Sequence, residues 1–231
     1  DFTFYFIGNF DEAALRGYIE QYIASLPGDA KKKENYKNVA ERPTGTVVNK
    51  FTKKMETPKA IARMYWYSTT APYTLENSIL ASAAGQVLSK LYLQKIREEA
   101  GAAYSAGAAG SVQMVGDRVF TTLLGHCPMK PEMADEAIKI MREEAVAISK
   151  SVDEATLNEI KAVMLKDADA AVKENSHWLG VYNMYVSRGI DTETDYKNIV
   201  KSLTPAKVAA FVKNVILKAG NNVEVIMLPE K

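Results

Sequence analysis

The chain has 231 residues, of which 47% are apolar and 25% charged, and it carries a formal net charge of +1. This length and apolar content suffice for a sizeable core without bridges or metal, while the balanced charge argues against a general nucleic-acid surface, which needs a basic patch. No apolar run approaches the roughly 20 residues that span a bilayer, and the single cysteine, Cys127, excludes an internal disulfide and a cysteine-based zinc site.

The first segment, residues 1–42, is predicted to form a strand and a helix followed by a linker. Residues 2–7 are rich in aromatic residues and favour a strand, and Asp11 is placed to cap the helix that stops at Pro27. The composition then turns polar and lysine-rich, which is typical of a linker. We therefore place a domain boundary after residue 42. Because the chain opens on a strand without an initiator methionine, we expect it to be a piece of a longer polypeptide.

The second segment, residues 43–231, is predicted to hold strand pairs separated by runs of several helices. The expected strands are 46–54, 60–69, 103–112, 117–124 and 223–228. The expected helices are 74–100, 132–149, one that starts at 151 and reaches at least Ala168, 176–188, 192–202 and 205–218. This order favours an α+β fold, a two-layer arrangement with a mostly antiparallel sheet and several helices packed on one face. A doubly wound parallel sheet would need strands and helices in strict alternation.

The stretch 88–105 is predicted to be the end of an amphipathic helix, a glycine stop and the start of a strand. Gly101 can adopt the left-handed conformation that ends a helix. Arg97 and Tyr104 lie seven positions apart across this corner, and a guanidinium and a phenol can together grip one carbonyl or oxyanion. The alternative is structural, with Arg97 serving the carbonyl end of the helix and Tyr104 packing at a sheet edge.

The sequence lacks the residues of a self-contained catalytic centre. A zinc peptidase with the H-x-x-E-H motif needs two imidazoles on one helix face and a glutamate base. The only histidines, His126 and His177, have no partner at that spacing, so no metal site is expected and both are predicted to be structural. Cys127 has only His126 beside it in sequence, which is the wrong geometry for a nucleophile and its base.

Four short motifs resemble, in the right order, segments of one enzyme family. They are Gly8-Asn9-Phe10-Asp11 with Ser25-Leu26-Pro27, Arg97-Glu98-Glu99 with Tyr104-Ser105, Lys173 to Trp178, and Val225 to Pro229. The family is that of the pitrilysin/insulinase-type zinc metallopeptidases, the inverzincins, and the resemblance is to their carboxyl-terminal, non-metal half. It implies that residues 1–42 are the tail of a preceding homologous domain plus its linker, and that residues 43–231 are the carboxyl-terminal peptidase-family domain.

The resemblance also implies a function. In that family two halves close over a peptide, the zinc ligands come from the amino-terminal half, and an Arg and a Tyr of the other half bind the substrate carbonyl and stabilise the oxyanion. Carried over, these roles fall on Arg97 and Tyr104. Tyr92 and Leu93 are candidate walls of the substrate pocket, with core packing as the alternative.

The resemblance implies a zinc-dependent endopeptidase, bacterial, in the periplasm or cytoplasm, with a peptide substrate and the amino-terminal half as partners. Zinc would belong to the parent enzyme and not to this segment, which should be inactive alone. The alternative is a catalytically inactive homologue that serves as a structural or recognition subunit of a peptidase complex.

Overall fold

The computed structural model describes residues 2–28, 37, 39 and 41–230, which form two compact units. Unit 1 comprises residues 1–41 and 168–193, and unit 2 comprises residues 42–167 and 194–231. The division after residue 41 lies one residue from the predicted boundary. The later segment of unit 1 was not anticipated, and the origin of residues 1–42 in a preceding homologous domain stays a prediction.

Unit 1 is mainly helical. Its helices include α1 (Glu12–Tyr18), which continues as a π-helical turn (Ile19–Ile23), and α5 (Asn175–Arg188). Asp11 caps α1 as predicted, with its side chain accepting a hydrogen bond from the Ala14 amide at 2.8 Å. The strand expected at residues 2–7 is not observed, because a strand needs a hydrogen-bonded neighbour and none of the described residues pairs with this segment.

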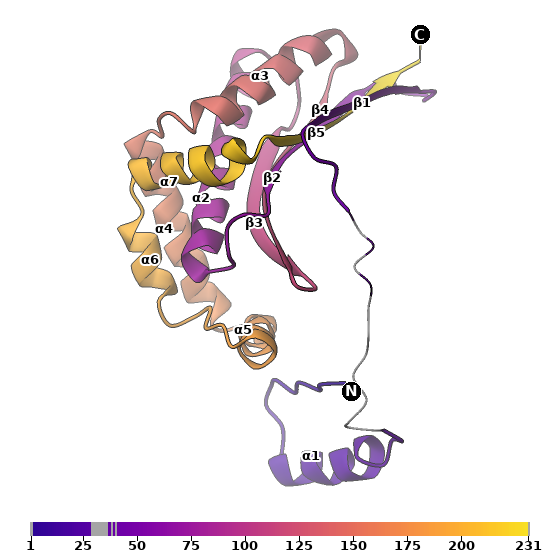
Figure 1. Ribbon diagram of the computed structural model, residues 1–231, viewed down its shortest axis with the longest axis vertical. Helices are drawn as coiled ribbons and strands as arrows, with labels where there is room; N and C mark the ends of the chain where they lie inside the picture. Colours follow the sequence, from indigo (N-terminus) through magenta and orange to yellow (C-terminus); the bar gives the residue numbers. More distant parts are fainter. Residues whose placement is uncertain (1, 29–36, 38, 40, 231) are drawn as a thin grey trace. The chain divides into compact units, whose positions relative to one another are not determined.

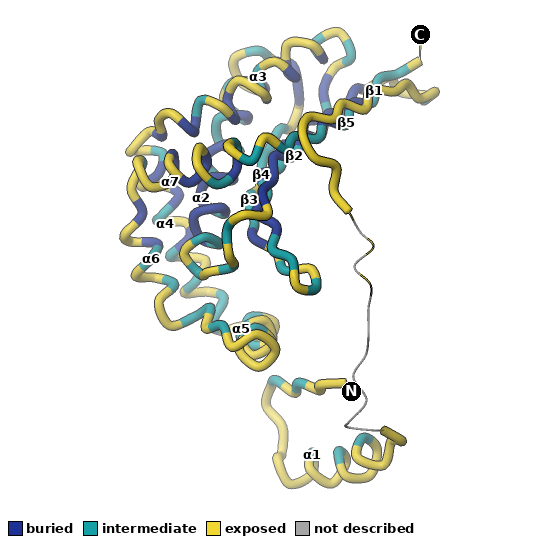
Figure 2. The backbone as a smooth tube through the Cα atoms, in the orientation of Figure 1, coloured by how far each residue is buried: buried dark blue, intermediate teal, exposed yellow. Residues whose placement is uncertain are grey.

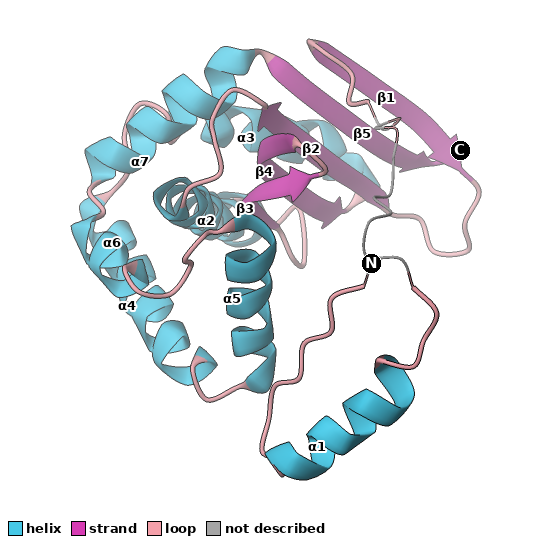
Figure 3. Ribbon diagram, turned by 60° about the horizontal axis from the view of Figure 1, so that its bottom comes forward, coloured by secondary structure: helices cyan, strands magenta, loops and turns pink. Residues whose placement is uncertain are grey.

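Unit 2 is built on a five-stranded sheet with the strand order β1-β5-β2-β4-β3 (Figure 3). The strands are β1 (Thr46–Lys53), β2 (Ala60–Ser68), β3 (Gly107–Val115), β4 (Arg118–Met129) and β5 (Asn221–Pro229). Every pairing is antiparallel except that of β1 with β5, which is parallel. The predicted mostly antiparallel sheet is confirmed.

The helices of unit 2 gather on one face of this sheet, as Figure 1 shows for α2, α3 and α7. In chain order the longer helices are α2 (Leu75–Tyr92) with its π-helical extension η2 (Leu93–Glu99), α3 (Ala134–Ala147), α4 (Glu154–Ala171), α6 (Tyr196–Ser202), and α7 (Pro205–Phe211) with its π-helical continuation (Val212–Ile216). The last four residues of α4, from Ala168 on, fall in unit 1. The predicted α+β class is confirmed. Among the described helices, none combines the length and the apolar character that a bilayer crossing requires.

Alternate residues of the strands point to opposite faces of the sheet, and those on one face are buried under the helices. In β2 the side chains of Ala60, Ala62, Met64 and Trp66 are all less than a tenth exposed, and they belong to the same buried cluster as the inner face of α2 (Figure 2). The residues between them face the opposite side of the sheet, here called the open face. Stability therefore comes mainly from the helix-covered face.

Two glycines let α2 lie directly on β3. A Cβ added at Gly110 would stand 1.8 Å from the carbonyl oxygen of Ala81, and one added at Gly85 would stand 2.0 Å from the amide nitrogen of Gly110. Both obstacles are backbone atoms, so the helix could not accommodate a side chain by a rotamer change. The close approach fixes α2 and its extension η2 against the sheet.

Candidate functional site

The corner between η2 and β3 is held by backbone hydrogen bonds and buried alanines. Gly101 has φ +61°, the left-handed conformation predicted for it. The Ala102 amide donates to the Ile96 carbonyl at 2.9 Å, and the Ala102 carbonyl accepts from the Lys130 amide at 3.0 Å. Ala102 and Ala103 are buried. The strand begins at Gly107 and not at residue 103, because residues 102–106 are used to cross from the helix to the sheet.

Arg97 and Tyr104 meet on the outside of this corner. Arg97 is exposed on η2, and Tyr104, the first residue after the buried alanines, is 90% exposed. The guanidinium carbon of Arg97 lies 5.8 Å from the centroid of the Tyr104 ring, a distance at which a cation and an aromatic face attract each other. The two residues are therefore neighbours in space, at the surface.

The helix that carries Arg97 is anchored to α3 by two contacts. The Tyr92 hydroxyl donates to the Met141 carbonyl at 2.7 Å, and the Lys95 ammonium pairs with Glu144 at 2.5 Å. The hydrogen bond to Glu144 raises the pKa of Lys95, so the ammonium group stays charged at neutral pH. The two contacts thereby hold η2, and with it Arg97, in a defined orientation.

Tyr92 and Leu93, the candidate pocket walls, have different surroundings. Tyr92 is fully buried in the core cluster, and burial, reinforced by Glu144, raises the pKa of its hydroxyl well above the ordinary value. Leu93 is half-buried. Tyr92 thus packs in the core, which was the alternative to a role in the wall of the substrate pocket.

The corner offers hydrogen-bond donors that form no ion pair with a carboxylate among the described residues. A guanidinium has five N–H donors and a phenol has one O–H donor. Among the described residues Arg97 has no ion pair, and Glu99, two positions away, accepts from the Gln94 side chain at 3.0 Å. The arrangement suits an uncharged carbonyl oxygen or an oxyanion that approaches from solvent.

The two histidines and the cysteine do not fit a zinc centre. Arg63 donates to the Nδ1 atom of His126 at 3.4 Å, and burial together with Arg63 lowers the pKa of that imidazole. His177 lies in the other unit, 2.9 Å from a Glu193 oxygen. Burial raises the pKa of the Cys127 thiol to about 12, far from thiolate chemistry. No group of three metal-ligating side chains occurs within the described residues.

Arg42 is a residue that the sequence analysis missed. It follows a lysine-rich polar stretch interpreted as a linker, and nothing in that stretch marks one cation among several. In unit 2 its guanidinium carbon lies 4.1 Å from the ring centroid of Phe120 on the open face of the sheet. Only the fold brings these residues together.

Comparison with known proteins matches residues 1–164 to the family described as the Peptidase M16 inactive domain. The chain is 25% identical over 237 residues to the probable zinc protease PqqL of Escherichia coli strain K12, covering 100% of this chain and 25% of that protein. It therefore spans about a quarter of the length of this curated relative.

Solved structures show the same fold. The crystal structure of the periplasmic protease PqqL from Escherichia coli superposes with a TM-score of 0.75 at 22% identity, over 96% of this chain and 25% of that one. A protease from Helicobacter pylori superposes with a TM-score of 0.73 at 18% identity, over 96% of this chain and 54% of that one. The family match covers well over half of the sequence, and the chain belongs to the M16 peptidase family, as an inactive domain of that family.

Proposed function

We propose that this chain is the carboxyl-terminal part of a zinc-dependent endopeptidase and contributes substrate binding and oxyanion stabilisation in a closed chamber. The zinc site lies in the amino-terminal half of the parent protein, which is the partner of this segment. The segment alone is inactive. A periplasmic parent is consistent with the description of the Escherichia coli relative as a periplasmic protease.

The observation that carries the proposal is the exposed pairing of Arg97 with Tyr104. The two side chains lie 5.8 Å apart, measured from guanidinium carbon to ring centroid, on a corner whose backbone is fixed by buried neighbours. Donors that are held in place before the substrate arrives need little reorganisation as negative charge develops on the carbonyl oxygen. Arg97 would bind the substrate carbonyl, and the Tyr104 hydroxyl would donate to the oxyanion. Leu93, half-buried one turn earlier, is a candidate contact for a substrate side chain.

The test is turnover of a peptide by the full-length parent protein carrying Arg97→Ala or Tyr104→Phe. Loss of one oxyanion donor typically costs about 2.7–4 kcal/mol, so we expect kcat to fall by two to three decades. Zinc content, measured by metal analysis, should not change. Tyr104→Phe keeps the ring beside Arg97 and removes only the hydroxyl, which separates donation from packing.

Tyr185→Phe is the matched control, because Tyr185 is a 61% exposed tyrosine on α5. Its turnover should equal that of the wild type. Near-normal kcat in both corner variants would remove the proposed role from Arg97 and Tyr104. It would not affect the family assignment, which depends on the sequence match.

The second candidate is a catalytically inactive homologue that acts as a structural or recognition subunit. The family description as an inactive domain is compatible with it. The parent sequence separates the two possibilities, because the enzyme needs an H-x-x-E-H motif outside these residues. A parent without that motif, and without turnover of any peptide, would support the recognition subunit.

A further inference from the structure

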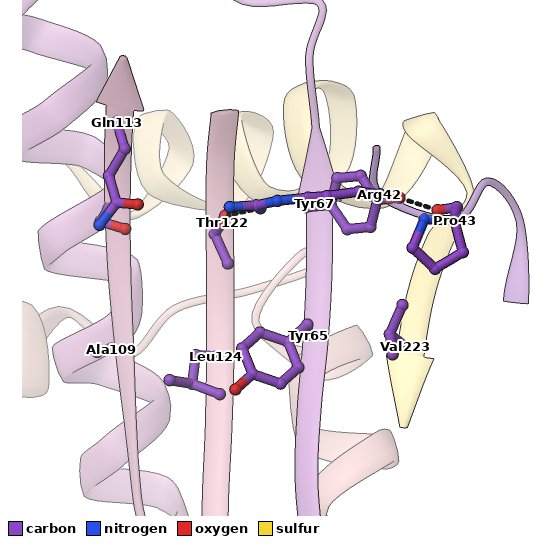
Figure 4. A pocket seen from close by; sticks show the side chains of 10 residues that line it. Arg42, Pro43, Tyr65, Tyr67, Ala109, Gln113, Thr122, Leu124 and Val223 are labelled. Atoms are coloured by element: carbon purple, nitrogen blue, oxygen red, sulfur yellow. Dashed lines mark hydrogen bonds between the residues drawn. The ribbon is translucent and has the colours of Figure 1, made fainter. Parts of the chain in front are cut away.

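The open face of the sheet in unit 2 holds a pocket of about 610 Å³ that is separate from the Arg97–Tyr104 corner. Its floor is formed by neighbouring strands, with Tyr65 from β2, Leu124 from β4 and Val223 from β5 (Figure 4). Arg42 and Pro43, which precede β1, form one rim. The volume falls within the range of small-ligand sites.

Arg42 is fixed over this pocket by three contacts. Its guanidinium carbon lies 4.1 Å from the Phe120 ring centroid and 5.4 Å from that of Tyr67. Its Nη1 atom donates to the Thr122 hydroxyl at 3.1 Å. The adjoining Pro43 carbonyl accepts a hydrogen bond from the Tyr67 hydroxyl. Because a guanidinium has five N–H donors, these contacts orient Arg42 and leave most of its donors available.

The positive charge of Arg42 has no ion-pair partner among the described residues. No Asp or Glu lines the pocket, and Arg42 has no ion pair among the described residues. Glu224 is the only carboxylate in the five strands, and it points to the helix-covered face, where Arg142 binds it at 2.5 Å. A cation above a wall of low polarity concentrates the local potential, so the complementary ligand group is an anion.

The remainder of the pocket is apolar with a polar margin. Tyr65, Leu124 and Val223 present ring and aliphatic surface below Arg42, and the Gln113 amide lies across the pocket on β3 (Figure 4). A ligand that satisfies both halves carries a carboxylate and an apolar side chain close to it. Arginine binds a carboxylate through two parallel hydrogen bonds.

We propose that this pocket binds a peptide through a carboxylate paired with Arg42 and an adjacent apolar side chain packed on Tyr65 and Leu124. The carboxylate is either the free carboxyl terminus of the peptide or an Asp or Glu side chain beside an apolar residue. This site does not depend on the oxyanion role of the corner, and binding can be measured without catalysis.

The experiment is calorimetric titration of the 231-residue chain with three peptides: acetyl-Gly-Gly-Phe with a free carboxylate, the same peptide as its amide, and acetyl-Gly-Glu-Phe amide. At least one carboxylate peptide should bind about tenfold or more tightly than the plain amide, which is the usual strength of a hydrogen bond to a charged group. Which carboxylate peptide binds identifies the source of the anion.

Two variants test the two halves of the pocket. Arg42→Met should weaken carboxylate binding about tenfold or more, while Lys53→Met, the same charge change at the exposed end of β1, should not. Ala109→Leu adds side-chain volume at an exposed pocket position. It should block peptide binding while the melting temperature stays unchanged. This second variant keeps the proposal testable even if Arg42→Met fails to fold.

Three outcomes would overturn the proposal. The first is equal binding of the carboxylate peptides and the plain amide. The second is carboxylate binding that survives both Arg42→Met and Ala109→Leu. The third is competition by inorganic phosphate at the same concentration as the peptide, which would indicate an unselective anion site with no use for the apolar floor. None of these results bears on kcat of the parent, so the proposed function is tested separately.

Discussion

The two faces of the sheet use their arginines in opposite ways. On the helix-covered face, Arg142 binds the buried carboxylate of Glu224 through Nε at 3.0 Å and Nη2 at 2.5 Å, and that hydrogen bonding lowers the pKa of Glu224. On the open face, Arg42 lies on aromatic rings and has no carboxylate partner among the described residues. The first guanidinium is committed to the fold, whereas the second keeps its charge available.

Arg97 at the corner resembles Arg42 in this respect, because its neighbour is the ring of Tyr104. An aromatic face holds a guanidinium in place while leaving its N–H donors unsatisfied. The comparison suggests a general criterion: an arginine stacked on a ring without an acid is a stronger candidate for recognition than one paired with an acid.

The largest loss of stability is expected from Gly110→Ala, where α2 packs on β3 on the helix-covered face. The new Cβ would meet the Ala81 backbone at 1.8 Å, so α2 must move off the sheet, and we expect the free energy of unfolding to fall by about 4 kcal/mol. Denaturant titration followed by circular dichroism measures it.

The control for Gly110→Ala is Gly107→Ala in the same strand, where a Cβ meets only the Ser89 hydroxyl at 3.4 Å. We expect this control to change stability by no more than about 0.5 kcal/mol. Similar losses in both variants would show that the close approach of α2 to β3 is not what the fold depends on.

Arg142→Met should have the next largest effect. Glu224 is only 3% exposed, and removing its partner leaves a buried charge uncompensated, which costs about 3 kcal/mol. Lys139→Met removes the same charge from the same helix, but its pair with Glu143, 3.8 Å apart, is exposed, so the expected cost is below about 0.5 kcal/mol.

Chemical unfolding at neutral pH distinguishes these two α3 variants. Adding Glu224→Gln to Arg142→Met should restore part of the lost stability, because the buried site is then uncharged. If the second substitution brings no recovery, the cost of Arg142→Met comes from lost packing and the assignment of Arg142 to charge compensation is wrong.

The smallest effect is expected from Tyr92→Phe, and it separates the buried tyrosine from the exposed one. The variant loses the 2.7 Å hydrogen bond to the Met141 carbonyl, which should lower the free energy of unfolding by about 1 kcal/mol. Turnover by the full-length parent should be retained. Tyr104→Phe should show the reverse: stability unchanged within about 0.5 kcal/mol and turnover reduced. If the same variant showed the larger loss both in stability and in turnover, the distinction between a structural Tyr92 and a functional Tyr104 would be contradicted.

Local signals in the sequence were sufficient for the fold class and for the corner. The helical period, the glycine stop at Gly101 and the cap at Asp11 each act within one or two turns of chain, and all three are found in the structure. The proximity of Arg97 and Tyr104 was also predictable, because only the end of a helix separates the two residues.

Features that depend on distant parts of the chain were not predictable. The helical period does not say which residues of a long amphipathic helix are innermost, so Tyr92 could not be told from Leu93, although the structure buries the first fully. The parallel pairing of β1 with β5 and the position of Arg42 over Phe120 each depend on tertiary packing. Such contacts leave no local periodicity in the sequence.

The parallel ladder between β1 and β5 joins the first and last strands of unit 2. Gly45 donates to the side chain of Asn221, a residue 176 positions later in the chain, and all eight residues of β1 are exposed. Closing so large a loop has a high entropic cost and β1 contributes little buried surface in return. We therefore expect this ladder to form late during folding and to open before the other strand pairs. Arg42 and Pro43 lead directly into β1, so an open ladder would leave them held by their contacts with β2 and β4.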